Sequence, residues 1–80
     1  MNQLDISIIV PIFNEESSIN ELYNELSSSI PHNLDYEIIF INDGSQDDSS
    51  KKIQSIILKD KKVKLINSLV LRKALKIQII

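Results

Sequence analysis

The stretch YEIIFINDGSQDD, residues 36–48, decides the fold of this chain. Its apolar run stops abruptly at Asn42 and is followed by Asp43 and by Gly44, the only glycine of the sequence. An apolar run that is bounded by turn-forming residues is typical of a buried strand that ends in a polar loop. In open parallel α/β sheets, ligands bind in the crevice outside the carboxyl ends of the strands. The loop that begins at Asn42 is therefore the first candidate for a binding site.

Before this stretch, the sequence predicts another strand and a helix. The run ISIIV, residues 6–10, is rich in β-branched residues and is typical of a strand that is covered on both faces. We expect Pro11 to end this strand, because proline has no N–H group for the ladder. Ser18 and Glu21 have the spacing of a capping box, which marks a helix start. The apolar residues that follow share one face of that helix, which the serine run 27–29 and a proline then end: Ile19, Leu22, Tyr23, Leu26 and Ile30.

After the second strand, residues 36–41, the sequence predicts a second helix and a third strand. Asp47 or Asp48 is a suitable cap for a helix that runs to about residue 58, and residues 63–66 form the next apolar run. Short connections between buried strands imply right-handed parallel crossovers. The predicted fold class is therefore α/β with the order β-α-β-α-β, half of a doubly wound domain. Such a parallel sheet with helices packed on it is incomplete, and an apolar face and an edge stay unpaired.

The chain divides into residues 1–67, which carry this pattern, and a tail of residues 68–80. In the tail, Leu71, Ala74 and Leu75 permit a helix, whereas Ile77 and its neighbours favour a strand. We predict a helix there.

Composition excludes several function classes. The sequence has no cysteine, so disulfides and thiolate chemistry are excluded, and this composition fits the cytoplasm. With a net charge of −2 and no basic stripe with interleaved aromatics, we expect no nucleic-acid partner. No apolar run approaches the roughly 18 residues of a membrane span. The single glycine excludes the G-x-G-x-x-G fingerprint, and no catalytic triad or metal-ligand spacing is found.

Two polar loops, residues 11–16 and 42–45, should open at the same end of the predicted sheet, beside helix N-termini. Helix N-termini attract anions through unpaired N–H groups and the helix dipole. Acidic side chains there accept hydrogen bonds from a base or a ribose, while backbone N–H groups face phosphate. This arrangement suits a nucleotide.

The residues PIFNEE (11–16) and EIIFINDGSQDDS (37–49) resemble the N-terminal nucleotide-binding half of family 2 glycosyltransferases with the GT-A fold. Within that family, the chain is most similar to dolichyl- or polyprenyl-phosphate sugar synthases, and the resemblance covers residue 6 to about residue 67. It implies transfer of a hexose from a UDP- or GDP-sugar to a polyprenyl phosphate or a glycan, mostly with inversion. Such enzymes build cell-envelope polysaccharides, and full-length relatives act on lipid-linked acceptors at the inner face of the membrane.

Carried over by position, the resemblance implies that Pro11, Phe13 and Glu15 line the pocket for the base and its ribose. Asp43 matches the acid that contacts the base, and with uracil it would accept from the ring N3–H.

The same resemblance implies supporting roles for three loop residues. Gly44 lets the backbone turn sharply, and Ser45 steadies the loop. Asn42 stands where the family often has a second aspartate, so a carboxylate is lost there.

The larger departures of this sequence from the family pattern concern the residues that carry out the sugar transfer. Full-length members bind a divalent metal, Mg²⁺ or Mn²⁺, through an Asp-x-Asp that follows a fourth strand, and their catalytic base lies further on. Neither is found in these 80 residues. The segment SLVLRKALKIQII (68–80) also lacks the glycine that usually follows the third strand of the family. A truncated or frame-disrupted gene would give this pattern, and we expect the fragment to bind nucleotide weakly and to turn over nothing.

Plainer interpretations remain for several residues. Asp43 is also a common turn residue, Phe13 has the alternative of packing under the first helix, and Glu16 suits a solvated loop. The lysines around residues 59–64 fit a solvated turn better than a phosphate site. The alternative functions are a non-catalytic nucleotide-binding module, and a remnant or subunit that needs a partner to complete its sheet.

Overall fold

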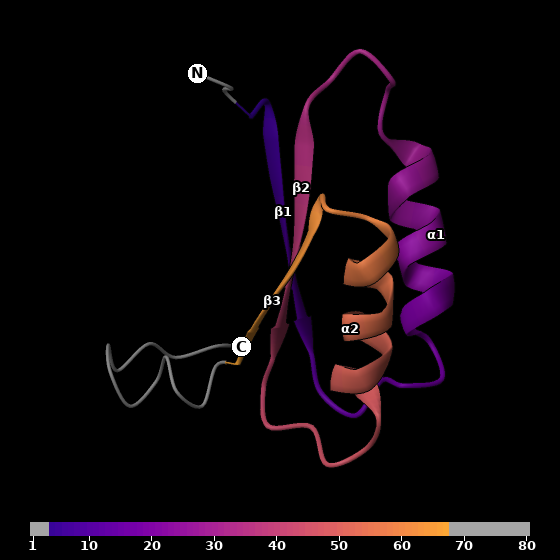
Figure 1. The fold of residues 1–80 in the computed structure, drawn as a ribbon, viewed down its shortest axis with the longest axis vertical. Helices are drawn as coiled ribbons and strands as arrows, with labels where there is room; N and C mark the ends of the chain where they lie inside the picture. Colours follow the sequence, from indigo (N-terminus) through magenta and orange to yellow (C-terminus); the bar gives the residue numbers. More distant parts are fainter. Residues whose placement is uncertain (1–3, 68–80) are drawn as a thin grey trace.

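The computed structural model of the chain describes residues 4–67. Within them the elements follow the predicted order: β1 (Ile6–Ile12), α1 (Ile19–Ser29), β2 (Tyr36–Asn42), α2 (Ser49–Lys59) and β3 (Val63–Asn67) (Figure 1). The α/β fold class is confirmed, and each predicted element of this range is present with ends shifted by at most two residues. The helix predicted over residues 68–80 lies outside the described residues.

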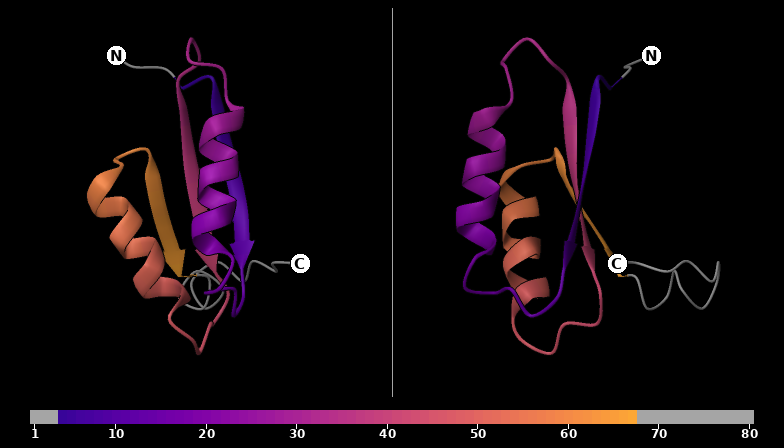
Figure 2. Two further views of the ribbon diagram at one scale, coloured as in Figure 1. Left: turned by 90° about the vertical axis from the view of Figure 1, so that its right-hand side faces the viewer. Right: turned by 180° about the vertical axis from the view of Figure 1, so that it is seen from behind.

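The described strands form one parallel sheet in the order β1-β2-β3. Both described helices lie on the same face of this sheet, as the views in Figures 1 and 2 agree. Successive right-handed crossovers that advance in one direction along a sheet place their helices on one side. This layering leaves the opposite face of the sheet, in the described part of the chain, without a helix over it.

The core lies between the helices and the sheet. Alternate residues of β2, Ile38 and Phe40, are fully buried under the helices, because successive side chains of a strand point to opposite faces. The buried apolar residues are Ile12, Ile19, Ile38, Phe40, Ile53, Ile56 and Val63.

The opposite face of the sheet, which we call the open face, carries the intervening apolar residues. By strand alternation and register these are Ile9, Pro11, Ile39, Ile41 and Ile66. Ile9 is 53% exposed and Ile66 is 37% exposed. The expectation that the first strand is covered on both faces is therefore wrong for the described residues, because both helices pack on the other side.

The expectation that Pro11 ends the first strand is also wrong, since β1 continues to Ile12. The carbonyl of Ile12 accepts from the N–H of Asp43 at 2.8 Å, so the alternation of the ladder turns the nitrogen of Pro11 away from β2. β1 is an edge strand of the described sheet, where a missing N–H leaves no partner unsatisfied.

The predicted capping box at α1 does not form among the described residues. Ser18 occupies the position before the helix, but its side chain makes no capping hydrogen bond. Instead, its backbone N–H donates to the carbonyl of Glu15 at 2.9 Å, and its carbonyl accepts from Leu22 at 2.9 Å. A backbone turn at Glu15 thus leads directly into the helix.

None of the helices described between residues 4 and 67 is long and apolar enough to cross a lipid bilayer.

Candidate functional site

Two loops meet at the carboxyl end of the sheet, at the lower end of the view in Figure 1. The first loop, residues 13–18, joins β1 to α1, and the second loop, residues 43–48, joins β2 to α2. Because Ile12 pairs with Asn42 in the parallel register, both loops leave the sheet at the same level. We call them the rim loops.

Hydrogen bonds join the rim loops through consecutive N–H groups of the first loop. They run from Asn14 N to Ser45 Oγ (3.0 Å), from Glu15 N to Ser49 Oγ (3.0 Å) and from Glu16 N to Asp47 Oδ2 (3.2 Å). Ser49, the first residue of α2, is fully buried. These N–H groups therefore donate to the protein, and the expectation that the backbone of this rim faces phosphate is wrong for them.

Asn14 adds a bond in the reverse direction, since its Oδ1 accepts from the N–H of Gln46 at 2.8 Å. Its φ of 50° lies in the left-handed region, which asparagine tolerates better than most residues. Sequence reasoning missed Asn14. The available signal was its residue type in a turn, since asparagine both adopts this conformation and bonds to nearby backbone.

Asp47 connects the helix start to the other loop. Its Oδ1 accepts from the N–H of Ser49 at 3.0 Å and from the Ser49 hydroxyl at 2.5 Å, while its Oδ2 accepts from Glu16. The hydroxyl bond, more than the backbone bonds, holds the pKa of the Asp47 carboxyl below its ordinary value. Of the two predicted caps, Asp47 therefore bonds to the first turn. Asp48 makes no capping bond among the described residues, and its Oδ1 lies 3.9 Å from Lys51 Nζ.

The residues predicted to contact a ligand lie around these loops. Phe13 and Asp43 directly follow the paired ends of β1 and β2, so they occupy neighbouring positions across the two strands. Phe13 is 57% exposed, which excludes its packing under the first helix. Glu15 is exposed, Asp43 is half-buried, and Pro11 lies on the open face beside Ile41.

The predicted supporting residues lie inside the second loop. Asn42 is buried, and its Oδ1 accepts from the N–H of Ser45 at 3.0 Å, while its Nδ2 donates to Asn67 Oδ1 at 3.3 Å. Gly44 has a φ of 75°, a conformation that residues with a Cβ rarely adopt. Ser45 uses its hydroxyl to accept from the first loop. The buried side chain of Asn42 therefore stabilises the second loop.

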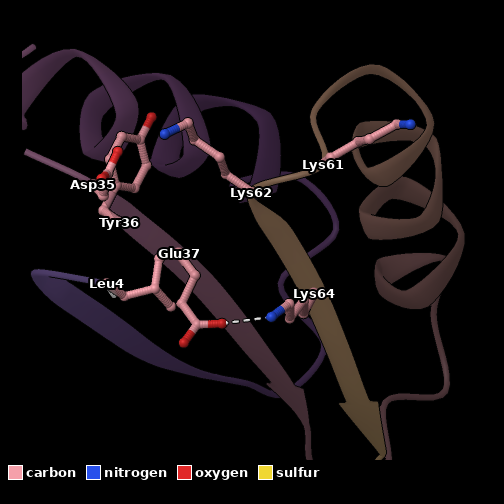
Figure 3. Close-up of a pocket in the computed structure, with 7 residues that line it drawn as sticks. All are labelled: Leu4, Asp35, Tyr36, Glu37, Lys61, Lys62 and Lys64. Atoms are coloured by element: carbon pink, nitrogen blue, oxygen red, sulfur yellow. Dashed lines mark hydrogen bonds and ion pairs between the residues drawn. The ribbon is translucent and has the colours of Figure 1, made fainter. Parts of the chain in front are cut away.

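A separate cavity of about 340 Å³ lies at the opposite end of the sheet (Figure 3). Its lining residues are Leu4, Asp35, Tyr36, Glu37, Lys61, Lys62 and Lys64. Lys64 Nζ contacts Glu37 Oε1 at 2.7 Å, and Lys62 Nζ lies 4.5 Å from the centre of the Tyr36 ring. Since two of its three lysines already have partners and two carboxyl groups line the cavity, it is poorly suited to phosphate.

Residues 4–67 contain no group of three or more histidine, cysteine or acidic side chains that could hold a metal ion. The acids of the rim loops are instead spread over both loops, and Asp47 is engaged by Ser49 and Glu16. The exposed Glu15 and the half-buried Asp43 give the rim carboxylate oxygens that are suited to accepting hydrogen bonds from N–H and hydroxyl groups.

Comparison with known proteins supports the resemblance to glycosyltransferases over most of the chain. The sequence profile of glycosyl transferase family 2 matches residues 7–69. An uncharacterized glycosyltransferase, YkcC of Bacillus subtilis (strain 168), is 38% identical over 65 residues, which cover 80% of this chain and 20% of the relative. The undecaprenyl-phosphate 4-deoxy-4-formamido-L-arabinose transferase of Pseudomonas savastanoi pv. phaseolicola (strain 1448A / Race 6) is 38% identical over 50 residues, 61% of this chain and 15% of the relative. A bactoprenol glucosyl transferase of Shigella phage SfV is 38% identical over 60 residues, 71% of this chain and 19% of the relative. The chain thus spans about a fifth of the length of the curated relatives that it matches.

Proposed function

Because the chain belongs to glycosyltransferase family 2, we propose that its rim loops recognise the nucleotide of a nucleotide-diphosphate sugar. The observation that carries this proposal is the joining of the two loops by hydrogen bonds at the carboxyl ends of adjacent parallel strands. In a parallel α/β sheet this is the position where ligands bind. The chain supplies nucleotide recognition in this proposal.

The chemistry of each side chain at the rim indicates which part of a nucleotide it would contact. The Asp43 carboxylate accepts from the N3–H of uracil, and the exposed ring of Phe13 offers a flat apolar surface to the base. Glu15, which is exposed at the start of the α1 turn, accepts from a ribose hydroxyl. Pro11, which lies on the open face beside Ile41, adds an apolar side chain at this end of the sheet. UDP-sugars are the preferred donors in this proposal, and GDP-sugars are the alternative.

The proposed role of the whole protein is sugar transfer to a lipid-linked acceptor such as a polyprenyl phosphate. Support comes from the relatives whose names contain undecaprenyl-phosphate or bactoprenol. We propose that this reaction takes place at the cytoplasmic face of a membrane. Residues 4–67 contain no cluster of side chains that could hold the divalent metal of the family. The proposed role of this chain therefore does not depend on a metal. We expect the 80 residues alone to give no sugar transfer.

Calorimetric titration of the chain with UDP, and separately with GDP, tests the nucleotide proposal. We expect weak UDP binding that Asp43→Ala lowers about tenfold or more, the usual result of losing a hydrogen bond to a charged group. The matched control is Asp48→Ala, which removes a nearby carboxylate that bonds only to Lys51 in the described structure. Circular dichroism must show that both variants keep the fold. Absence of heat with both nucleotides, or equal binding by wild type and Asp43→Ala, contradicts the proposal.

A second candidate function is that of a subunit that completes its sheet against a partner. The specific observations in its favour are that β1 is an edge strand of the described sheet and that the open face is apolar, with Ile9 53% exposed. A wild-type chain that stays monomeric in light scattering contradicts this candidate and leaves the nucleotide proposal intact.

A further inference from the structure

Asp47 occupies a position between the rim loops that a helix cap alone does not require. A cap needs one acceptor for one N–H group of the first turn. Oδ1 of Asp47 fills that need at Ser49, whereas Oδ2 reaches across to the N–H of Glu16, which is 31 residues away in the sequence. The second oxygen therefore acts between the loops.

The Ser49 hydroxyl extends this connection to the next residue of the first loop. It donates to Asp47 Oδ1 at 2.5 Å, and its oxygen accepts from the N–H of Glu15 at 3.0 Å. A hydroxyl whose hydrogen is directed to a carboxylate presents its lone pairs elsewhere, so Asp47 fixes the orientation in which Ser49 accepts from Glu15. Ser49 is fully buried, which leaves it no solvent alternative.

Asp47 and Ser49 together fill the positions that an anionic ligand would take. Consecutive backbone N–H groups form concave anion sites in proteins. In this chain the N–H groups of Glu15 and Glu16 are satisfied by an internal carboxylate and its hydroxyl partner. The lowered pKa of the Asp47 carboxyl is consistent with a charge that persists at neutral pH.

From this arrangement we infer that Asp47 is a positioning residue, which holds the two rim loops in one conformation so that Glu15 and Asp43 meet the same nucleotide. This inference rests on the proposed function. Loops that are fixed before binding do not lose their freedom upon binding, so a ligand that needs both loops binds more tightly. The inference predicts that affinity and loop order fall together when the second oxygen of Asp47 is removed.

The variant that isolates this contact is Asp47→Asn. It keeps the shape of the side chain and an acceptor for Ser49, but its amide nitrogen is unable to accept from Glu16. Asp48→Asn is the matched control, because it makes the same chemical change at the adjacent residue. The Asp48 side chain is 63% exposed and contacts only Lys51, at 3.9 Å, in the described structure.

The experiment combines amide hydrogen exchange by NMR with UDP calorimetry on the 80-residue chain. For Asp47→Asn we expect exchange at Glu15 and Glu16 to speed up about tenfold, and UDP affinity to fall by about the same factor, because a charge-assisted hydrogen bond is lost. For Asp48→Asn we expect changes of less than about twofold in both quantities, as for other exposed ion pairs.

Exchange at Glu15 and Glu16 that equals that of wild type in Asp47→Asn overturns the inference. Faster exchange with unchanged UDP affinity overturns it as well, because a merely structural contact gives that result. If the wild type itself binds neither UDP nor GDP, the proposed function is wrong, and the exchange rates still decide whether Asp47 holds the loops.

If Asp47→Asn does not fold, Asp47→Glu replaces it, since glutamate keeps the charge and both acceptor oxygens on a longer stem. We then expect UDP affinity to fall in proportion to the loss of protection at Glu16. Wild-type affinity in Asp47→Glu together with faster exchange at Glu16 overturns the inference.

Discussion

At the scale of single residues, Tyr23 shows how one polar contact joins the two helices on the sheet. Its hydroxyl donates to Asp60 Oδ2, at the end of α2, at 2.5 Å. This hydrogen bond, followed by burial and the negative charge of Asp60, raises the pKa of Tyr23 to about 12. The sequence places Tyr23 on the apolar face of the first helix, and its ring does pack against the core while its hydroxyl donates to the half-buried Asp60.

The raised pKa fixes the sign of a pH prediction for Tyr23. The neutral form is favoured by folding, so its contribution to stability is complete below the ordinary pKa of 10.0 and is lost as the pH rises toward 12. We expect Tyr23→Phe to lower the free energy of unfolding by about 1 kcal/mol at pH 7. The difference from wild type should shrink above pH 10, as measured by urea denaturation. A difference that stays constant up to pH 12 would contradict this assignment.

Asp47 gives the opposite sign of pH dependence. Its pKa is lowered mainly by the Ser49 hydroxyl, so its contribution to stability is present above the ordinary pKa of 3.8 and is lost as the pH falls below it. We expect Asp47→Asn to be less stable than wild type at pH 7 and to approach wild type in acid. Urea denaturation at several pH values checks this, with Asp48→Asn as the variant that should follow wild type throughout.

The sequence revealed one part of the candidate site and concealed the other. Asp43 and Gly44 are visible because a strand, a turn and an acid follow one another in the chain. The connections of Asn14 to Ser45 and of Glu16 to Asp47 are invisible in sequence, because each joins residues 31 positions apart. Only the three-dimensional meeting of the rim loops gives a cap such as Asp47 its second role.

At the scale of elements, the two faces of the sheet differ in burial, and one matched pair of variants measures this difference. Ile38 of β2 is fully buried under the helices, whereas Ile9 of β1 is 53% exposed on the open face. We expect Ile38→Ala to lower the free energy of unfolding by roughly 2–5 kcal/mol, the usual result of deleting a buried side chain. For Ile9→Ala we expect a loss below about 1 kcal/mol, because about half of its side chain already contacts water. Equal losses in urea denaturation would show that a packed layer covers the open face.

The order and type of the elements followed from periodicity, because apolar residues recur at helical spacing in α1 and α2 and run continuously in the strands. The end of β1 did not follow, because a proline is acceptable in a strand whose outer edge is unpaired, and edge position is a property of the sheet. One-sided burial was likewise hidden. An all-apolar strand has the same pattern whether one face or both faces are covered.

At the scale of the whole molecule, the described residues 4–67 form a single layer of helices on a sheet, with the open face on the other side (Figure 2). A stable sheet of this kind normally buries both faces. The chain covers about a fifth of the relatives that it matches. Among residues 4–67 this apolar surface is exposed, and exposed apolar surface favours self-association.

This exposure predicts that the isolated chain associates as its concentration increases. We expect light scattering to give an apparent mass that rises above the monomer mass of 9.1 kDa, and the double variant Ile9→Glu/Ile66→Glu to stay monomeric. The two glutamates place like charges on the open face and make the net charge more negative, from −2 to −4, so they oppose association through electrostatic repulsion as well as through lost apolar area. Leu58→Glu is the control, because Leu58 is 87% exposed but lies on α2, away from the open face, and this variant should associate like wild type. A wild-type chain that remains monomeric at every concentration, or an equal effect of Leu58→Glu, would show that the open face does not drive association.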